Sequence, residues 1–243
     1  MSLRLPRLSA DPHAPFPPVE TALDEPNGLL AFGGDLHPAR LINAYRHGIF
    51  PWYSAGEPIL WWSPDPRTVF DTPDFTLARR FRRSLRHLPW TLRADTAFDT
   101  VVAACATAPR PGQSGTWIDA AMRAAYGELH RLGHAHSVEV WDGARLIGGI
   151  YGVLAGPVFC GESMFSAVSG GSKLALAALC RWLAHVGVDL LDAQVPNPHL
   201  ASLGAREMDR KTYLTRLGCP APPGTAPAPW TERFPPWTAP ELA

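Results

Sequence analysis

Apolar positions in the first quarter of the chain form two strand-like groups around a helix-like one. Residues 29–32 (LLAF) end at a Gly33-Gly34 turn, and residues 38–47 have the spacing of a helix that ends at Gly48. Two aromatic groups follow, before a linker that contains Pro64 and Pro66. The pattern predicts a small unit of mixed structure that ends near residue 66.

Beyond that linker, helical spacing alternates with strand-like runs. Helices are expected at residues 75–88, 97–106, 119–132 and 173–186, and strands at residues 90–94, 136–141, 145–153, 158–165 and 190–195. Asp142-Gly143 and Gly156-Pro157 are turn signals that join the middle three strands as hairpins. A further helix after Pro198 and a segment at residues 210–217 follow. This order predicts an α+β fold of the acetyltransferase-like type, whose mixed, largely antiparallel sheet is flanked by helices.

Proline usage marks the ends of these units. We expect a small N-terminal domain at residues 1–66, a larger acetyltransferase-like domain at residues 67–218, and a Pro/Ala-rich tail at residues 219–243. Tails of this composition bury too little surface to fold alone, so an extended or disordered end is predicted. Its tryptophans, Trp230 and Trp237, are the side chains able to dock on the body.

Composition narrows the function classes. The 22 Lys and Arg residues balance 22 Asp and Glu residues, which argues against a protein that coats nucleic acid non-specifically but permits a local basic patch. The four cysteines contain no CxxC pair, and the histidines lack partners at ligand spacing, so neither a disulfide framework nor a metal site is predicted. With no signal-like or membrane-spanning apolar stretch, a soluble, cytoplasmic protein is expected.

A carboxylate and an amide interrupt the apolar run at residues 190–195. In a regular strand, Asp192 and Gln194 would share one face, opposite Leu191, Ala193 and Val195. Burying such groups is costly unless they hydrogen-bond to each other or to a ligand. These residues are therefore either a catalytic pair or partners in a structural hydrogen bond near the strand end.

Glu162 is the second unusual polar residue, because it lies in the apolar run at residues 158–165. The preceding Gly161 indicates a bulge or a close backbone approach. A carboxylate there can bind a cationic group, and the alternative is an edge strand with Glu162 in water. Residues 169–173 (SGGSK) offer N–H groups to a phosphate or simply cap a helix, and they match no Walker A or acyl-CoA pyrophosphate loop.

Aromatic and basic residues suggest nucleic-acid chemistry. Trp52, Trp62 and Trp117 adjoin glycine, proline or serine, and Trp117 follows the polar loop at residues 109–112. Open tryptophans can stack on a nucleobase for roughly 1–3 kcal/mol per base, whereas core packing is expected for Trp61. One helical face carries Arg79, Arg82, Arg83 and Arg86. This face either contacts phosphate groups or is a basic helix surface in solvent.

Eight segments, spread over about residues 26–215, resemble the leucyl/phenylalanyl-tRNA–protein transferase family. They are 26–35 (PNGLLAFGGD), 48–54 (GIFPWYS), 58–67 (PILWWSPDPR), 115–118 (GTWI), 133–141 (GHAHSVEVW), 148–153 (GGIYGV), 159–166 (FCGESMFS) and 192–205 (DAQVPNPHLASLGA). The resemblance implies transfer of Leu or Phe, and less well Met, from aminoacyl-tRNA to proteins that begin with Arg or Lys, which marks them for degradation. It implies no cofactor, no membrane and no DNA.

The resemblance also implies roles for individual residues. Asp192 and Gln194 would be the catalytic pair, Trp52 and Trp117 would hold the terminal adenosine, and Glu162, Ser163 and Asn197 would line the reaction centre. The amino-acid pocket would contain Ile150, Phe159, Met164, Leu179 and Leu191. From the basic pattern, tRNA phosphates are assigned to Arg79, Arg82, Arg83, Arg86 and Lys173.

The chemistry of these substrates needs little from a catalyst. The donor ester is already activated, and the acceptor α-amine has a pKa of about 7.7–8.0. We hypothesise that the Gln194 carbonyl accepts a hydrogen from the amine while Asp192 orients the Gln194 amide, and that Glu162 binds the acceptor's cationic side chain. A related transferase acting on a cell-wall precursor and a catalytically silent tRNA-binding module are the rival readings.

Overall fold

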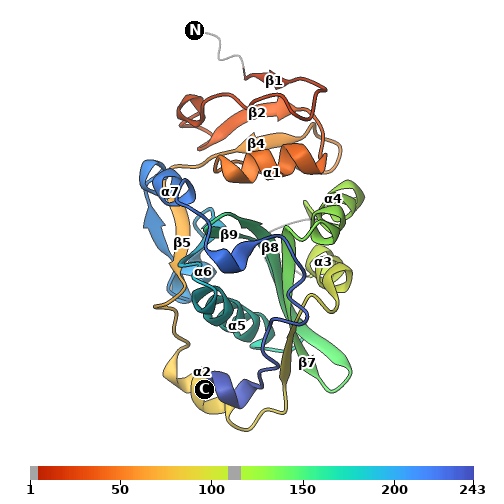
Figure 1. The fold of residues 1–243 in the computed structure, drawn as a ribbon, viewed down its shortest axis with the longest axis vertical. Helices are drawn as coiled ribbons and strands as arrows, with labels where there is room; N and C mark the ends of the chain where they lie inside the picture. Colours follow the sequence, from red (N-terminus) through yellow and green to blue (C-terminus); the bar gives the residue numbers. More distant parts are fainter. Residues whose placement is uncertain (1–4, 109–115) are drawn as a thin grey trace.

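The computed structural model of the chain describes residues 5–108 and 116–243, so the predicted loop at residues 109–112 lies outside it. Nearest the N-terminus is a four-stranded sheet in the order β1-β2-β4-β3 (Figure 1). Its strands are β1 (Arg7–Leu8), β2 (Leu29–Gly33), β3 (Phe50–Pro51) and β4 (Leu60–Trp62). The sheet is antiparallel except for the pairing of β1 with β2.

Helix α1 (Pro38–Arg46) packs beside this small sheet. Its first turn is fixed by the His37 side chain, which accepts the Ala39 N–H, and by Pro38 at the first helical position. Leu41, Ala44 and Tyr45 form its buried face. These residues recur at helical spacing, and they turn the Tyr45 hydroxyl toward the larger part of the molecule.

The larger part is built on a seven-stranded sheet in the order β11-β5-β10-β9-β8-β7-β6. The strands are β5 (Arg67–Asp71), β6 (Thr91–Ala94), β7 (Ala135–Asp142), β8 (Arg145–Ala155), β9 (Val158–Ser166), β10 (Leu190–Gln194) and β11 (Arg206–Met208). All neighbours are antiparallel except β9 and β10, which run parallel. The predicted α+β class, with a small N-terminal unit and a mixed sheet, is therefore confirmed.

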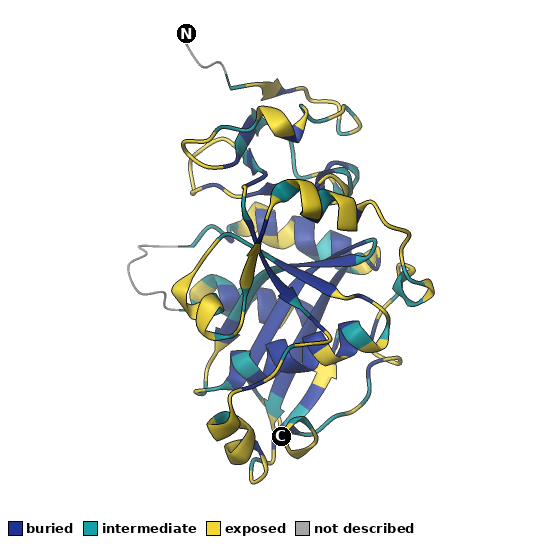
Figure 2. Ribbon diagram, turned by 90° about the vertical axis from the view of Figure 1, so that its left-hand side faces the viewer, coloured by how far each residue is buried: buried dark blue, intermediate teal, exposed yellow. Residues whose placement is uncertain are grey.

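Helices cover both faces of the large sheet. They are α2 (Arg79–Leu85), α3 (Phe98–Thr107), α4 (Ala120–Arg131), α5 (Gly171–His185), α6 (Pro198–Ser202) and α7 (Arg210–Leu217). Alternate residues of β8 separate the two cores: Tyr151 belongs to the cluster with α3 and α4, and Ile150 belongs to the cluster with α5. Figure 2 shows the resulting buried strands at the centre of the larger part.

Two segments differ from the sequence prediction. The helix expected at residues 75–88 is shorter, because Phe75 packs edge-on against Phe70 with ring centroids 5.7 Å apart, and α2 begins only after Ala78. The tail is extended, apart from two 3-10 turns, but it is anchored on the body. Trp230 is only 2% exposed and stacks on His136 at 4.0 Å between ring centroids. The domain boundaries at residues 66/67 and 218/219 stay predictions.

Candidate functional site

A cavity of about 830 Å³ lies between the small sheet and one edge of the parallel strand pair. Strand β3 supplies Phe50 and Pro51 to its wall. The ends of β9 and β10 and the start of α6 supply most of the remainder, with single residues from β5, β8 and α5. Nine of the residues predicted for the site line it: Trp52, Trp117, Ile150, Glu162, Ser163, Met164, Leu191, Gln194 and Asn197. Residues from distant parts of the sequence therefore meet at one cavity.

The cavity opens where β9 and β10 separate. Their pairing ends at Asp192 and Cys160, although β9 continues to Ser166. A register shift in the β8–β9 ladder leaves Glu162 as the extra residue, which confirms the bulge predicted beside Gly161. Beyond the pairing, residues 161–164 face the cavity.

Strand β10 also departs from regular alternation. Its pairing with β5 shifts between Asp192 and Gln194, and Gln194 has a left-handed backbone with φ of 65°. The expectation that both side chains share one face is wrong for this reason. Gln194 lines the cavity together with Leu191 and Ala193, whereas Asp192 points away from it and is 0% exposed.

Asp192 is held in a buried ion pair with Arg67, which is 1% exposed. The Arg67 Nε lies 3.0 and 3.1 Å from the two carboxylate oxygens, and its Nη2 lies 3.0 Å from Oδ2. Oδ2 also accepts the Tyr213 hydroxyl at 3.0 Å, and Oδ1 accepts the Gln194 backbone N–H at 2.8 Å. Asp192 thus fixes the strained backbone of Gln194, and the predicted contact with the side-chain amide is wrong.

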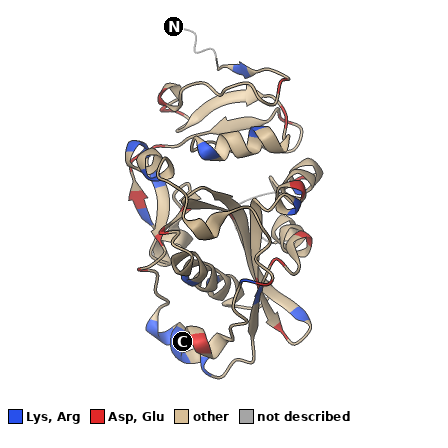
Figure 3. Ribbon diagram, in the orientation of Figure 1, with Lys and Arg blue, Asp and Glu red and all other residues tan. Residues whose placement is uncertain are grey.

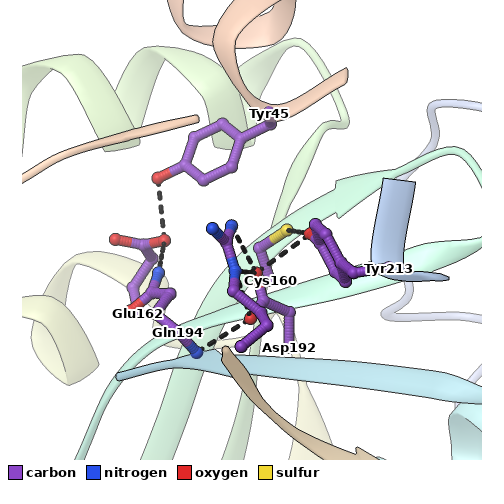
Figure 4. Close-up of polar contacts among 7 residues, drawn as sticks. Tyr45, Cys160, Glu162, Asp192, Gln194 and Tyr213 are labelled. Atoms are coloured by element: carbon purple, nitrogen blue, oxygen red, sulfur yellow. Dashed lines mark hydrogen bonds and ion pairs between the residues drawn. The ribbon is translucent and has the colours of Figure 1, made fainter. Parts of the chain in front are cut away.

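The Gln194 side chain turns instead to Glu162. Its Nε2 donates to Glu162 Oε1 at 2.9 Å, and the Tyr45 hydroxyl donates to the same oxygen at 2.7 Å (Figure 4). The Tyr126 hydroxyl donates to Oε2 at 2.8 Å. Glu162 therefore lies in an internal strand with three donors around it, so the alternative of an edge-strand residue in water is wrong.

This environment changes the acidity of Glu162. Burial raises the pKa of Glu162 to about 7, and the nearby Asp192 carboxylate adds to the rise. The hydrogen bonds from Tyr45, Tyr126 and Gln194 favour the ionised form and oppose the shift. Burial next to Glu162 also raises the pKa of both tyrosine hydroxyls well above the ordinary value, so they remain protonated donors.

The apolar lining of the cavity differs in part from the prediction. Ile150, Met164 and Leu191 line it, but Phe159 and Leu179 do not. Phe159 comes before the β9 bulge and packs in the α5 core at 0% exposure, and Leu179 lies one turn deeper in α5. Leu176, one turn earlier on that helix, takes the position expected for Leu179.

The aromatic and polar rim of the cavity is partly open. Trp52 is 39% exposed, and its backbone carbonyl accepts the Trp62 indole N–H at 2.6 Å. Trp117, which also lines the cavity, is half-buried. Asn197 caps α6 by accepting the His199 N–H at 2.7 Å, which orders the segment that closes this end of the cavity.

Comparison with known proteins decides the family. Residues 69–218 match the family described as leucyl/phenylalanyl-tRNA protein transferase, and residues 34–65 match the N-terminal domain of the same family. The chain belongs to this transferase family. A relative from Xanthomonas campestris pv. campestris strain 8004, named leucyl/phenylalanyl-tRNA–protein transferase, is 62% identical over 239 residues, with 96% of this chain and 94% of the relative covered.

A further relative has the same name, whereas the similarity to a solved structure is remote. A relative of the same name from Xylella fastidiosa strain M23 is 58% identical over 227 residues, with 93% of each chain covered. Among solved structures, the structure of L-PGS from Bacillus licheniformis matches 62% of this chain and 48% of its own at 10% identity, with a TM-score of 0.37. Neither the cell-wall transferase nor the silent binding module is favoured once the leucyl/phenylalanyl-tRNA–protein transferase family is established.

The basic residues of this transferase lie apart from the cavity. The predicted arginines Arg79, Arg82, Arg83 and Arg86 are exposed on or just after α2, and Lys173 is half-buried in the first turn of α5. Figure 3 shows the basic α2 at the end of the molecule away from the small N-terminal sheet. None of these side chains lines the cavity.

Four residues that support the transferase site were not found from the sequence: Arg67, Tyr45, Tyr126 and Tyr213. Because burying the Asp192 carboxylate alone is costly, a buried cation beside it is expected. Arg67, the first residue of an apolar strand, was a sequence indication of that cation. Tyr45 follows Leu41 by four residues and Tyr126 follows Met122 by four, so helical spacing predicts burial. Spacing does not predict that both hydroxyls meet the same carboxylate.

Residues 5–108 and 116–243 contain neither a candidate metal site nor a candidate membrane span. No group of three or more His, Cys, Asp or Glu side chains in those ranges is arranged to hold a metal ion. None of the helices described there combines the length and apolar character needed to cross a membrane.

Proposed function

We propose that this protein transfers Leu or Phe, and less well Met, from aminoacyl-tRNA to the α-amine of proteins that begin with Arg or Lys, creating a degradation signal. The observation that carries the proposal is the meeting of Gln194, Glu162 and an apolar pocket in one cavity. We further propose that it acts in the cytoplasm, where aminoacyl-tRNA is available, and needs no cofactor.

The donor would enter with its terminal adenosine at the rim. Trp52 and Trp117 offer open aromatic surface for the base, and stacking of this kind contributes roughly 1–3 kcal/mol. The esterified side chain would then extend toward Ile150, Met164 and Leu191, with Leu176 added to the predicted pocket. Rejection of β-branched side chains requires a clash at Cβ, because size alone discriminates by only about 1–3 kcal/mol per methylene.

Gln194 is the residue proposed to contact the attacking amine. Its Nε2 donates to Glu162, and this bond directs the side-chain carbonyl oxygen elsewhere. Among the described residues, no hydrogen bond to that oxygen is found, so it can accept a hydrogen from the amine. Asp192 would contribute as a positioning residue, since it holds the Gln194 backbone N–H. Most of the acceleration would come from keeping amine and ester at attack distance.

Glu162 is proposed to select the acceptor. A carboxylate offers about four lone-pair positions, of which Tyr45 and Gln194 use two on Oε1 and Tyr126 uses one on Oε2. One position remains on Oε2, and it can accept a charge-assisted bond from a guanidinium or ammonium group. Ser163 and Asn197, which line the same cavity, would complete the reaction centre.

The tRNA body would be held by phosphate contacts from α2 and Lys173. Because each neutralised phosphate releases counterions, affinity should fall steeply as salt is raised. Because α2 lies away from the cavity, it could contact the body of a tRNA whose aminoacylated end lies in the cavity.

Transfer of radiolabelled leucine from Leu-tRNA tests the proposal directly. One peptide begins with Arg, and a second, otherwise identical peptide begins with Ala. Label on the Arg peptide alone is expected. Absence of label on both peptides, from protein that still binds Leu-tRNA, would exclude the proposed reaction.

A further inference from the structure

Three oxygen-bearing side chains form a closed triangle that meets the cavity at Glu162. The Tyr45 and Tyr126 hydroxyls lie 2.5 Å apart, Tyr45 lies 2.7 Å from Glu162 Oε1, and Tyr126 lies 2.8 Å from Oε2. The tyrosines come from α1 and α4, and both are at most 2% exposed. Each side of the triangle is within hydrogen-bond distance.

The protons available to the triangle can be counted. If Glu162 is ionised, only the two hydroxyl protons are present for three O···O contacts. One contact must then bring two lone pairs together without a proton between them. If Glu162 is protonated, its carboxyl O–H supplies the third proton, and the three bonds can follow one another around the ring. The closed triangle therefore fits a neutral Glu162.

We propose that Glu162, enclosed in the triangle with Tyr45 and Tyr126, holds one proton while the acceptor site is empty, and that a cationic N-terminal side chain displaces this proton when it binds. The inference rests on the proposed function, in which Glu162 takes that side chain. The proton passes from the carboxyl oxygen to solvent as the guanidinium or ammonium group arrives. One positive charge replaces another, so the net charge of the site is unchanged.

The groups around Glu162 agree with this exchange. Beyond the triangle, Glu162 interacts with the charge of Asp192 and the thiol of Cys160, and Tyr126 interacts with Tyr151. Asp192 is itself paired with Arg67. Gln194 donates to Glu162 without carrying charge, and His199 on the cavity wall is the other titratable group exposed there. With these neighbours the pKa of Glu162 is raised to about 7, chiefly by burial.

The exchange makes acceptor selection depend on pH. The ionised fraction of a group whose pKa is about 7 rises from about one tenth at pH 6 to about nine tenths at pH 8. Since only the ionised form can accept the cation, the apparent affinity for it follows that fraction. Preference for a cationic side chain should therefore grow about tenfold over this range.

The test compares a peptide that begins with Arg with one that begins with citrulline, its neutral isostere. The ratio of their kcat/KM values cancels titration of the α-amine, which both peptides share. In the natural protein this ratio is expected to rise about tenfold from pH 6 to pH 8. In Tyr45→Phe and Tyr126→Phe the midpoint should move away from that of the natural protein, because each variant opens the triangle and removes one hydroxyl that contacts Glu162.

Tyr53→Phe is the matched control. It removes a buried tyrosine hydroxyl that donates to a different carboxylate, Asp119, at 3.3 Å. This control should retain the midpoint of the natural protein. A merely structural role for the triangle would lower activity equally at every pH and leave the midpoint in place.

The outcomes separate the inference from the proposed function. A clear preference for Arg over citrulline that stays constant from pH 6 to pH 8 would overturn the inference and leave the proposed function intact. Equal transfer to both peptides at every pH would instead refute the role of Glu162 in acceptor selection. If one tyrosine variant fails to fold, a shifted midpoint in the other variant is sufficient support for the inference.

Discussion

The buried pair of Arg67 and Asp192 predicts how the protein responds to Asp192→Asn. The substitution keeps the shape of the side chain but removes the charge that faces a guanidinium 1% exposed to solvent. Removing one partner of a buried ion pair costs roughly 3–5 kcal/mol, because the other charge stays buried and uncompensated. At roughly 2–4 °C per kcal/mol for a chain of this size, Tm should fall by about 6–20 °C.

A second consequence concerns Gln194. The Asp192 carboxylate accepts the Gln194 N–H at 2.8 Å, in a residue whose left-handed backbone needs support from its surroundings. Asp192→Asn should therefore lower kcat as well as stability. Gln194→Ala should lower kcat while changing stability little, because the Gln194 side chain is only partly buried and faces the cavity.

Equilibrium unfolding in urea, followed by tryptophan fluorescence, gives the required measurement. Asp189→Asn is the control, since Asp189 is an exposed carboxylate just before the same strand and should change stability by no more than about 0.5 kcal/mol. The double variant Arg67→Met with Asp192→Leu leaves no lone buried charge, so it should lose less stability than Asp192→Asn. An Asp192→Asn protein as stable as the control, with its kcat still lost, would refute the positioning role and point to direct action on the substrate.

Three further predictions concern the rim, the basic helix and the tail. Trp52→Ala should raise the KM for Leu-tRNA by about 5- to 150-fold through loss of roughly 1–3 kcal/mol of stacking, and an unchanged KM would remove Trp52 from the donor site. Arg82→Ala and Arg83→Ala should each reduce the slope of log affinity for tRNA against log salt by about 0.7–0.9, unlike Arg145→Ala at the first residue of β8, outside α2. Trp230→Ala should destabilise the protein by about 3–5 kcal/mol in urea unfolding, whereas a loss under 1 kcal/mol would mean that the tail adds little.

Local sequence patterns predicted much of the fold because they depend on short-range rules. The hairpins at Asp142-Gly143 and Gly156-Pro157 and the bulge beside Gly161 follow from turn chemistry and alternation. The same rules failed at β10, where the irregularity at Ala193 is fixed from outside the strand. Asp192 is paired with a residue 125 positions away, so the alternation pattern of β10 itself does not encode that contact.

The candidate site, like the fold, was predicted only where local patterns determine it. Glu162 and Gln194 stand out because polar residues in apolar runs need partners. Their partners Tyr45 and Tyr126 are separated from Glu162 by 117 and 36 positions, and only the packing of α1 and α4 brings them together. Phe159 was misplaced because its direction depends on which side of the bulge it lies.

The division of labour between Glu162 and Gln194 is tested most directly by acceptor kinetics of Glu162→Gln with the Arg and citrulline peptides at pH 8. Loss of a charge-assisted hydrogen bond of roughly 1.5–3 kcal/mol should raise the KM for the Arg peptide by about 10- to 150-fold and abolish its advantage over citrulline. The KM for Leu-tRNA should remain unchanged. An Arg peptide that keeps its KM and its advantage in Glu162→Gln would contradict the account.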